Sequence, residues 1–363
     1  MTARRRVGAW LAIWAGMVVL LVVIGGATRL TESGLSITEW KPVTGVLPPL
    51  DRAAWDAEFA RYQQIPEYQQ FNRGMSLAQF QVIYLWEFTH RLWARLVGLA
   101  FALPLVVFLW RREVSGPLAW RLGGLLVLLG LQGAMGWYMV QSGLTLRTDV
   151  SQYRLAAHLS LALVLYGAAV WTAADLLGVR GRGITPGIEG AGRLRRLTGG
   201  FAGFAFLTIV SGAFVAGLNA GSAWNTFPLM GGRVVPPGYL AMSPWYRNLF
   251  ENVTAVQFHH RLLGLGVVVS AILLWRASRR VELTTHGRSA FAALPLVALL
   301  QVTLGISTLL LRVPVVVAVL HQLGAVLVLT AGLLALAAVQ TTNGRQRAPA
   351  VVESGASRAI SSG

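Results

Sequence analysis

The sequence predicts an all-α membrane protein whose eight transmembrane helices form two tandem four-helix bundles related by pseudo-two-fold symmetry. Of its 363 residues, 55% are hydrophobic and only 12% are charged, whereas a soluble protein carries about 25% charged residues. A helix needs roughly 20 apolar residues to span a bilayer, and a backbone in lipid must satisfy its own hydrogen bonds. Eight stretches are suitable: residues 7–27, 84–110, 118–140, 155–177, 197–218, 256–275, 291–311 and 313–339.

The arginines predict how these helices are oriented. The net charge is +17, but the basic residues cluster before the first apolar run and in every second connection after it. If the helices alternate, all these clusters lie on one side, which the positive-inside rule assigns to the cytoplasm. Both termini are then cytoplasmic in a bacterial inner membrane, and anionic lipid rather than nucleic acid is the expected partner of the excess charge. The clusters comprise Arg4, Arg5, Arg6, Arg111, Arg112, Arg121, Arg180, Arg182, Arg193, Arg195, Arg196, Arg276, Arg279, Arg280, Arg288, Arg345 and Arg347.

The two halves of the chain repeat the same motifs in the same order. The segment EFTHR, which contains His90, is matched by QFHHR, which contains His260. A Gln-x-x-x-Gly motif then begins 42 residues after His90 and 41 residues after His260. Because four helices per half is an even number, both halves start on the same side and the repeat is parallel. The predicted divisions are an N-terminal half at 1–180, a cytoplasmic linker at 181–196, a C-terminal half at 197–340 and a disordered tail at 341–363.

Four histidines, two in each half, are candidate metal ligands. Each lies in the first two turns or so of a predicted helix that enters from the external side, so all four share one depth near the outer surface. A single intramembrane histidine can be a polar residue satisfied between helices, but four at one depth indicate function. Paired imidazoles across a four-helix unit are a common way to ligate haem iron. They are His90, His158, His260 and His321.

Other ligand chemistries fit less well. Zinc or copper would need further carboxylate or histidine ligands, and no such cluster is evident. The chain has no cysteine, which excludes iron–sulfur clusters, thiolate-bound haem, disulfides and c-type attachment. His286 lies in a cytoplasmic loop and His259 has no counterpart in the first half, so neither is predicted to be a ligand.

The two halves differ at one charged position. Glu87 precedes His90 by three residues and shares its helix face, whereas the second half has Gln257 at the matching place. A carboxylate at membrane depth is costly unless it is used or paired. The first half is therefore predicted to handle protons or developing positive charge, and the second to hold a haem. The alternative is a structural ion pair between Glu87 and Arg91 at i+4, and both roles can coexist.

Small and basic residues surround the histidines. Arg29, Arg91 and Arg261 are candidate partners for haem propionates. Arg95 and Arg154 could serve in the same way or could snorkel to the interface. Several glycines would either give a porphyrin room or serve ordinary helix packing; these are Gly98, Gly133, Gly136, Gly264, Gly266, Gly305 and Gly324.

Taken together, these motifs resemble the heme A synthase family. The chain is similar to it over residues 8–340, through Gly25-Gly26-x-Thr28-Arg29, Glu87-Phe88-x-His90-Arg91, Ala157-His158, Phe258-His259-His260-Arg261 and Leu320-His321-Gln322. The absence of cysteine matches the family's mitochondrial and proteobacterial branch, and it rules out thiol-based electron transfer or disulfide control. The long loop at 31–75 must then act otherwise, by covering the substrate site or contacting a partner.

The resemblance implies an oxidoreductase that acts on a CH group. Such enzymes convert the C8 methyl of heme O to the formyl group of heme A, through a hydroxymethyl haem, for terminal oxidase assembly. By position, His90 and His158 would flank heme O and Glu87 would be the essential carboxylate. His260 and His321 would ligate a prosthetic haem b. Heme O synthase and an electron-transfer protein are the implied partners, and a homo-oligomer is left open.

Two other functions compete with this one. A membrane electron carrier with two b-type haems would need no acid in either half, so Glu87 counts against it. A haem transporter or chaperone would need weak ligation and a wide path, so paired histidines in both halves count against it.

Overall fold

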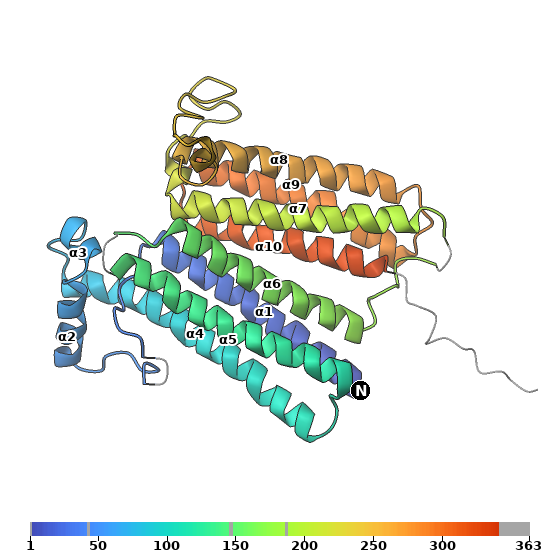
Figure 1. The fold of residues 1–363 in the computed structure, drawn as a ribbon, viewed down its shortest axis with the longest axis horizontal. Helices are drawn as coiled ribbons and strands as arrows, with labels where there is room; N and C mark the ends of the chain where they lie inside the picture. Colours follow the sequence, from blue (N-terminus) through green and yellow to red (C-terminus); the bar gives the residue numbers. More distant parts are fainter. Residues whose placement is uncertain (1, 42–43, 145–147, 186–187, 341–363) are drawn as a thin grey trace, which may run out of the picture.

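The computed structural model describes residues 2–41, 44–144, 148–185 and 188–340, and within them it confirms an all-α protein with eight helices long and apolar enough to cross a membrane. The chain is therefore an integral, multi-pass membrane protein. Figure 1 shows all eight running along the long axis of the molecule. They are α1 (Ala3–Leu30), α4 (Leu77–Trp110), α5 (Gly116–Leu144), α6 (Gln152–Leu176), α7 (Ala191–Gly217), α8 (Val253–Ser278), α9 (Thr285–Leu310) and α10 (Val315–Ala338).

All the membrane helices except α10 begin before their apolar runs, and the shift is largest, at six or seven residues, for α4, α7 and α9. Helix α4 starts at Leu77, seven residues before the predicted start, because Ser76 and Gln79 form a capping box that extends it beyond the apolar segment. His90 therefore lies thirteen residues into its helix, and its predicted place in the first two turns is wrong. Helix α7 starts at Ala191, inside the predicted linker. The predicted tail at 341–363 lies outside the described residues.

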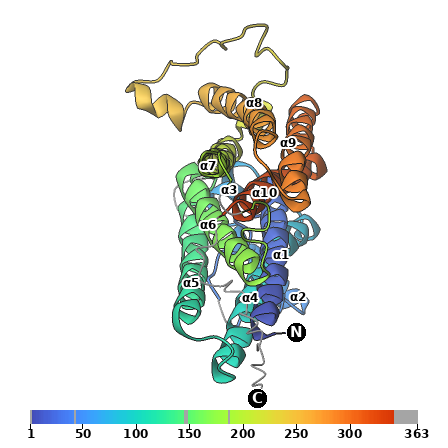
Figure 2. The same ribbon diagram turned by 90° about the vertical axis from the view of Figure 1, so that its right-hand side faces the viewer.

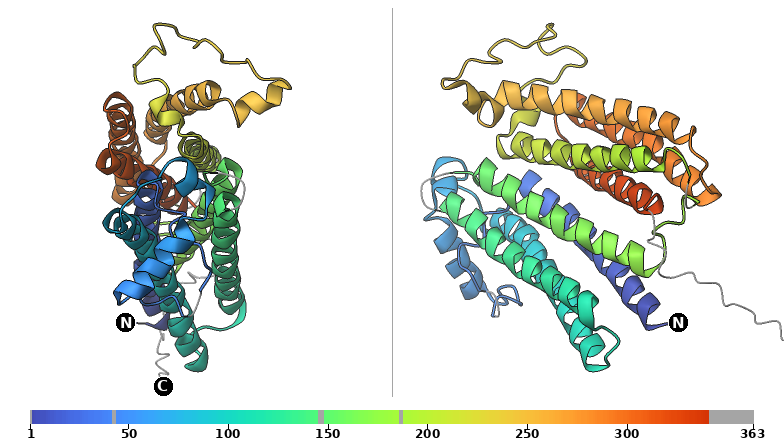
Figure 3. Two further views of the ribbon diagram at one scale, coloured as in Figure 1. Left: turned by 90° about the vertical axis from the view of Figure 1, so that its left-hand side faces the viewer. Right: turned by 45° about the vertical axis from the view of Figure 1, so that its right-hand side comes forward.

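The helices pack as two four-helix groups. In the first, α1 contacts α4, α4 contacts α5, α5 contacts α6 and α6 returns to α1; in the second, α7 to α10 close in the same order. Helices α1 and α6 meet α7 and α10 along the boundary between the groups, as Figure 1 and the right-hand view of Figure 3 show. This adjacency agrees with the predicted tandem bundles, and a pseudo-two-fold relation between them stays a prediction.

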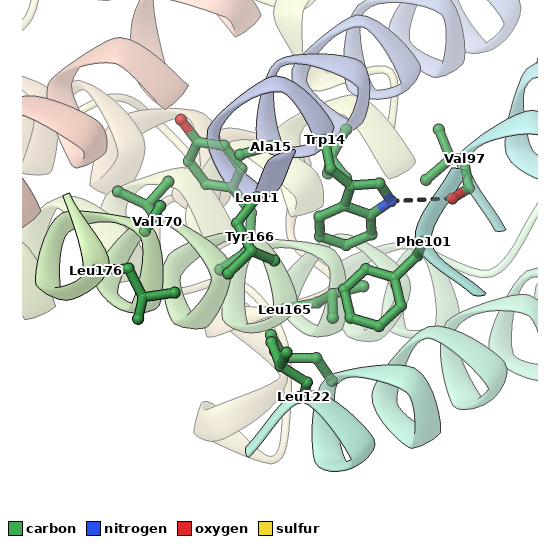
Figure 4. Packing of buried hydrophobic residues seen from close by; sticks show 14 of the residues in the cluster. Leu11, Trp14, Ala15, Val97, Phe101, Leu122, Leu165, Tyr166, Val170 and Leu176 are labelled. Atoms are coloured by element: carbon green, nitrogen blue, oxygen red, sulfur yellow. Dashed lines mark hydrogen bonds between the residues drawn. The ribbon is translucent and has the colours of Figure 1, made fainter. Parts of the chain in front are cut away.

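The core of the first bundle is built around Trp14 of α1. Its indole Nε1 donates a 2.9 Å hydrogen bond to the carbonyl of Val97 in α4, while its ring packs against Phe101. Leu122 of α5 and Leu165 of α6 close the cluster from below, as Figure 4 shows. Since lipid is as apolar as these side chains, close packing and the indole hydrogen bond hold the helices together here.

Polar contacts join the two halves. The Gln322 side chain of α10 donates a 3.0 Å hydrogen bond to the Val22 carbonyl of α1. The hydroxyls of Tyr166 in α6 and Thr330 in α10 lie 2.7 Å apart. Polar groups inside a bilayer have no water to bond, so they must bond one another. These two contacts therefore fix how the two halves pack together.

The end of the molecule that carries the N-terminus, which faces the reader in Figure 2, is basic. The carboxylate of Asp175, at the end of α6, lies 3.4–3.9 Å from guanidinium nitrogens of Arg4, Arg121 and Arg180. Asp175 thus forms ion pairs with arginines from α1, from α5 and from the segment after α6.

The opposite end carries the long connections, seen at the left of Figure 1 and facing the reader in the left-hand view of Figure 3. The first connection contains α2 (Arg52–Tyr62) and α3 (Pro66–Gln70), which contact α4 and α5 respectively. The second contains two 3₁₀ turns, η1 (Ala220–Ser222) and η2 (Trp245–Leu249), which contact α8.

Candidate functional site

Each of the four predicted histidines faces a glycine of a neighbouring helix. A Cβ atom built on these glycines would lie only 2.7–3.1 Å from the nearest ring atom, so the imidazoles occupy the space that a side chain would need. Gly136 and Gly305 belong to the Gln-x-x-x-Gly motif, whereas Gly25 and Gly212 were not predicted to contact a histidine. The pairs are Gly25 with His90, Gly136 with His158, Gly212 with His260 and Gly305 with His321.

The other predicted glycines divide into two kinds. A Cβ atom on Gly98, Gly133 or Gly264 would meet no described atom within 4 Å, so these positions border open space. Gly266 instead lies against the Phe204 ring, and Gly324 against the Gln301 side chain. The last two glycines therefore serve packing between helices, which is the alternative reading of such residues.

In the second half, the two histidine rings lie close enough together for both to reach one metal ion. The ring centroids of His260 and His321 lie 6.3 Å apart, with the ring planes at 88°. A metal–imidazole nitrogen bond is about 2 Å long, so two such bonds and the two ring radii together span roughly 6 Å between the centroids. The separation therefore fits one iron between the rings.

The Nδ1 atoms of this pair are both engaged with the protein. The hydroxyl of Ser211 lies 2.7 Å from Nδ1 of His260. Nδ1 of His321 lies 3.2 Å from the backbone carbonyl of Gln301 and 3.1 Å from its side-chain amide. Among the described residues, Nε2 of neither ring has a hydrogen-bond partner. When Nδ1 is bonded to the protein, Nε2 is the nitrogen that a metal would bind.

The first half holds its pair differently. The side-chain amide of Gln132 lies 3.2 Å from Nδ1 and 3.3 Å from Nε2 of His158, and it donates to the His158 carbonyl at 3.1 Å. For His90, the described residues provide no hydrogen-bond partner to the ring. The surroundings of the two histidine pairs therefore differ, in addition to the predicted difference between Glu87 and Gln257.

Glu87 lies one turn from His90, is only 2% exposed and is fully engaged. One carboxylate oxygen accepts hydrogen bonds of 2.7 Å from both the Ser36 hydroxyl and the Ile37 amide, and the other pairs with Arg91. The predicted pair with Arg91 is therefore present. In addition, the carboxylate fastens the first long connection to α4, an anchoring role that the sequence did not reveal.

Gln257 makes the matching contact in the second half, with the opposite hydrogen-bond polarity. Its side-chain amide donates to the carbonyls of Trp224 at 3.1 Å and Gly221 at 3.4 Å. Where the first connection presents donors to a carboxylate, the second presents acceptors to an amide. Each side chain therefore suits the groups that it faces: the Glu87 carboxylate accepts from hydrogen-bond donors, and the Gln257 amide donates to backbone carbonyls.

The predicted propionate partners already bind carbonyl groups. Arg91 donates to Ile37 and Glu39, and Arg261 to Trp224 and Thr226, over 2.6–3.1 Å. A guanidinium has five N–H donors, so these contacts leave others unused. For Arg261, the buried Nε has no hydrogen-bond partner among the described residues.

The remaining arginines are held near the same end of the molecule. Arg29 reaches across to the second half, where it donates to Ala216 at 3.0 Å and Asn219 at 2.9 Å. Arg154 donates to the Tyr138 carbonyl at 2.7 Å and lies over that ring. The side chain of Arg95 donates to the Lys41 carbonyl at 2.8 Å.

A buried carboxyl group that the sequence did not single out lies in the first connection. Glu67 of α3 is 8% exposed, and its Oε2 has no hydrogen-bond partner among the described residues. Burial, together with the nearby acids Glu32 and Asp149, raises the pKa of Glu67 to about 8. The raised pKa favours the neutral form of this carboxyl at pH values below about 8.

Comparison with known proteins agrees with this architecture. A sequence model of the family described as cytochrome oxidase assembly protein (COX15-CtaA) matches residues 8–333. A protein named Heme A synthase from Rhodospirillum centenum is 51% identical over 329 residues, covering 90% of this chain and 86% of the relative. One of the same name from Nitrosospira multiformis is 46% identical over 331 residues, with 91% and 92% covered.

A human relative has a similar level of identity. Heme A synthase COX15 from Homo sapiens is 46% identical over 338 residues, which cover 91% of this chain and 81% of the human protein. The match extends across both four-helix groups and includes all four histidines and Glu87 within the matched residues 8–333. The chain belongs to the COX15-CtaA family of cytochrome oxidase assembly proteins.

Proposed function

We propose that the protein is a heme A synthase, an oxidoreductase that converts the C8 methyl group of heme O to the formyl group of heme A. Family membership and the relatives named Heme A synthase support this activity. Within the structure, the observation that carries it is the buried carboxylate of Glu87, one turn from His90, in one half only.

In this proposal, the second half holds haem b through His260 and His321. The 6.3 Å ring separation and the two engaged Nδ1 atoms support this assignment. Arg261 supports it further, because its buried Nε offers an unused donor to a propionate. When bound there, a b-type haem supplies one-electron redox chemistry.

The first half binds heme O as substrate between His90 and His158. Oxidation of a methyl group to a formyl group takes one oxygen from water and releases four electrons and four protons, with a one-electron acceptor protein as the oxidant. Glu87 lies where it can stabilise positive charge on the reacting carbon or accept a proton from the attacking water. Arg29 and Arg91 keep free donors for the propionates.

The orientation is part of the same proposal. The basic end of the bundle, which gathers Arg4, Arg121 and Arg180 around Asp175, would face the cytoplasm with both termini. The haem sites would then lie toward the periplasmic side of a bacterial inner membrane. Heme O would arrive from heme O synthase, and electrons would leave to a partner protein or within an assembly of several copies.

Haem extraction and chromatography of the purified protein test the function. A host that makes heme O but lacks its own heme A synthase should yield haem b together with heme O or heme A. Haem b alone in both halves, with no conversion of added heme O, would favour the electron carrier with two b-type haems. Conversion lost in a Glu87→Gln variant that keeps haem b would support the assignment of the first half as the reacting half.

A further inference from the structure

The second half contains a hydrogen-bond relay that sets the protonation of its first histidine. The hydroxyl of Ser211 donates to the Thr208 carbonyl at 2.7 Å, so its single hydrogen is used. The same oxygen lies 2.7 Å from Nδ1 of His260 and can only accept there. Nδ1 of His260 therefore carries the hydrogen, and Nε2 keeps the lone pair that iron needs.

The second histidine of this half is prepared in a related way. Nδ1 of His321 lies 3.2 Å from the backbone carbonyl of Gln301, which can only accept and so favours the hydrogen on Nδ1. The side-chain amide of Gln301 lies 3.1 Å from the same Nδ1 and not within hydrogen-bond distance of Nε2. Both rings then present Nε2 lone pairs, at the separation that one iron requires. Outer hydrogen bonds of this kind orient metal ligands and raise their basicity.

Among the described residues of the first half, no hydroxyl group bonds the ring of His90. The turn of α1 that faces His90 reads Ile24-Gly25-Gly26, and no residue in it has a hydroxyl group. Ile24 precedes the glycine against His90, as Ser211 precedes the glycine against His260. The donor amide of Gln132 also lies within 3.3 Å of both ring nitrogens of His158, where it competes with a metal for the lone pair.

We propose that Ser211 is a positioning residue that makes the haem of the second half resident, and that the missing hydroxyl beside His90 leaves the haem of the first half exchangeable. The inference rests on the proposed function, because a substrate haem must enter and leave while a prosthetic haem must stay. Ser211 touches the ligand His260 and acts through it. Loss of such an outer partner typically weakens metal affinity 10–100-fold.

The test is the rate of haem loss from the purified holoprotein to excess apomyoglobin, with the released haem identified by chromatography. In the parent protein, haem b should leave more slowly than heme O or heme A. Ser211→Ala should release haem b about 10-fold faster, at the lower end of the 10–100-fold range for loss of an outer hydrogen-bond partner. The effect should be small because the Thr208 carbonyl also contacts the His260 ring and would still hold it. The midpoint potential of haem b should rise, since a less basic imidazole stabilises ferric iron less.

Two further variants distinguish positioning from packing. Ser211→Thr keeps the hydroxyl and should restore slow haem b loss and the parent potential. Ser270→Ala removes a hydroxyl of the same half that bonds only within its own helix, to the Val267 carbonyl at 2.9 Å, and should change neither. Parent-like haem b loss and potential in Ser211→Ala would overturn the inference.

The outcomes separate this inference from the proposed function. If heme O is never converted but Ser211→Ala still loses haem b faster, the heme A synthase assignment fails and the role of Ser211 stands. If conversion is normal and Ser211→Ala behaves as the parent, the role of Ser211 fails alone. Equal release of the two haems from the parent protein would overturn the division into resident and exchangeable sites.

Discussion

The hydroxyl of Ser36 donates a 2.7 Å hydrogen bond to the carboxylate of Glu87, and this contact fastens the first long connection to α4. The Ile37 amide donates to the same oxygen. Glu87 therefore links the turn of α4 that precedes His90 to the first long connection. A substitution at this position can act on chemistry, on the covering loop, or on both, and the contacts allow the two effects to be separated.

Glu87→Gln should abolish most of the conversion of heme O. Its side-chain oxygen can still accept from Ser36 and Ile37, but the negative charge is gone. Removal of an acid–base group typically costs 10²–10⁴-fold in rate, so conversion should fall by about 10²-fold or more while haem b content stays at the parent level. Chromatography of haem products over time measures both.

Ser36→Ala is the matched control for this variant. It removes one loop anchor and leaves the carboxylate, the Ile37 amide and Arg91 in place. Conversion should drop only a few-fold, because the remaining contacts still hold the charged carboxylate in its place. An equal loss of conversion in both variants would assign Glu87 to loop anchoring and remove its catalytic role.

Gly305→Ala should impair the holding of haem in the second half. A Cβ at this position would lie 2.7 Å from Cε1 of His321 and would push the ring out of line with His260. Overpacking of this kind costs about 1–3 kcal/mol, so haem b occupancy after purification should fall. Gly264→Ala, whose Cβ would meet nothing within 4 Å, is expected to keep the parent occupancy, measured from the haem-to-protein absorbance ratio.

Gly26→Ala should disturb the boundary between the two halves. Its Cβ would collide with the side-chain oxygen of Gln322, whose amide bonds the Val22 carbonyl. We expect a lower thermal unfolding midpoint in detergent. Combining Gly26→Ala with Gln322→Ala should recover part of the loss, because the residue that meets the new methyl group is shortened. Additive losses in this double-mutant cycle would contradict a direct contact.

The cap formed by α2 and α3 in the first connection should become less stable as the pH rises. The pKa of Glu67 is raised from 4.5 to about 8, so between these values the folded cap binds more protons than the unfolded chain, and its stability falls with increasing pH. Below about pH 4.5 the carboxyl is neutral in both states and the effect disappears. Limited proteolysis within α2 and α3 should therefore be faster at pH 8 than at pH 5.

Glu67→Gln is the control for this pH dependence. The amide is neutral at every pH and has nearly the same shape, so the variant should be cleaved at similar rates at pH 5 and pH 8 after correction for the protease's own pH profile. A variant that keeps the full pH dependence would assign the effect to groups other than Glu67.

Much of the site was predictable because its residues carry the chemistry themselves. His90 and His260 stand in matching motifs, and the Gln-x-x-x-Gly motif places Gly136 and Gly305 against the other two histidines. Glu67 and Ser211 could not be found in this way. A carboxyl group in a polar connection and a serine in an apolar helix are both common. Only the neighbouring residues show that burial raises the pKa of Glu67 and that the Ser211 hydroxyl contacts His260.

The sequence by itself determined the eight membrane helices, since length and apolar composition decide whether a helix can span a bilayer. It also determined the two pairs of histidines and the acid Glu87, which precedes a histidine in one half only. Only the tertiary structure decided how these groups are held. The polarity of the contacts around Glu87 and Gln257, and the relay from Ser211 to His260, depend on backbone atoms brought together by packing, whose positions no local pattern of side chains specifies.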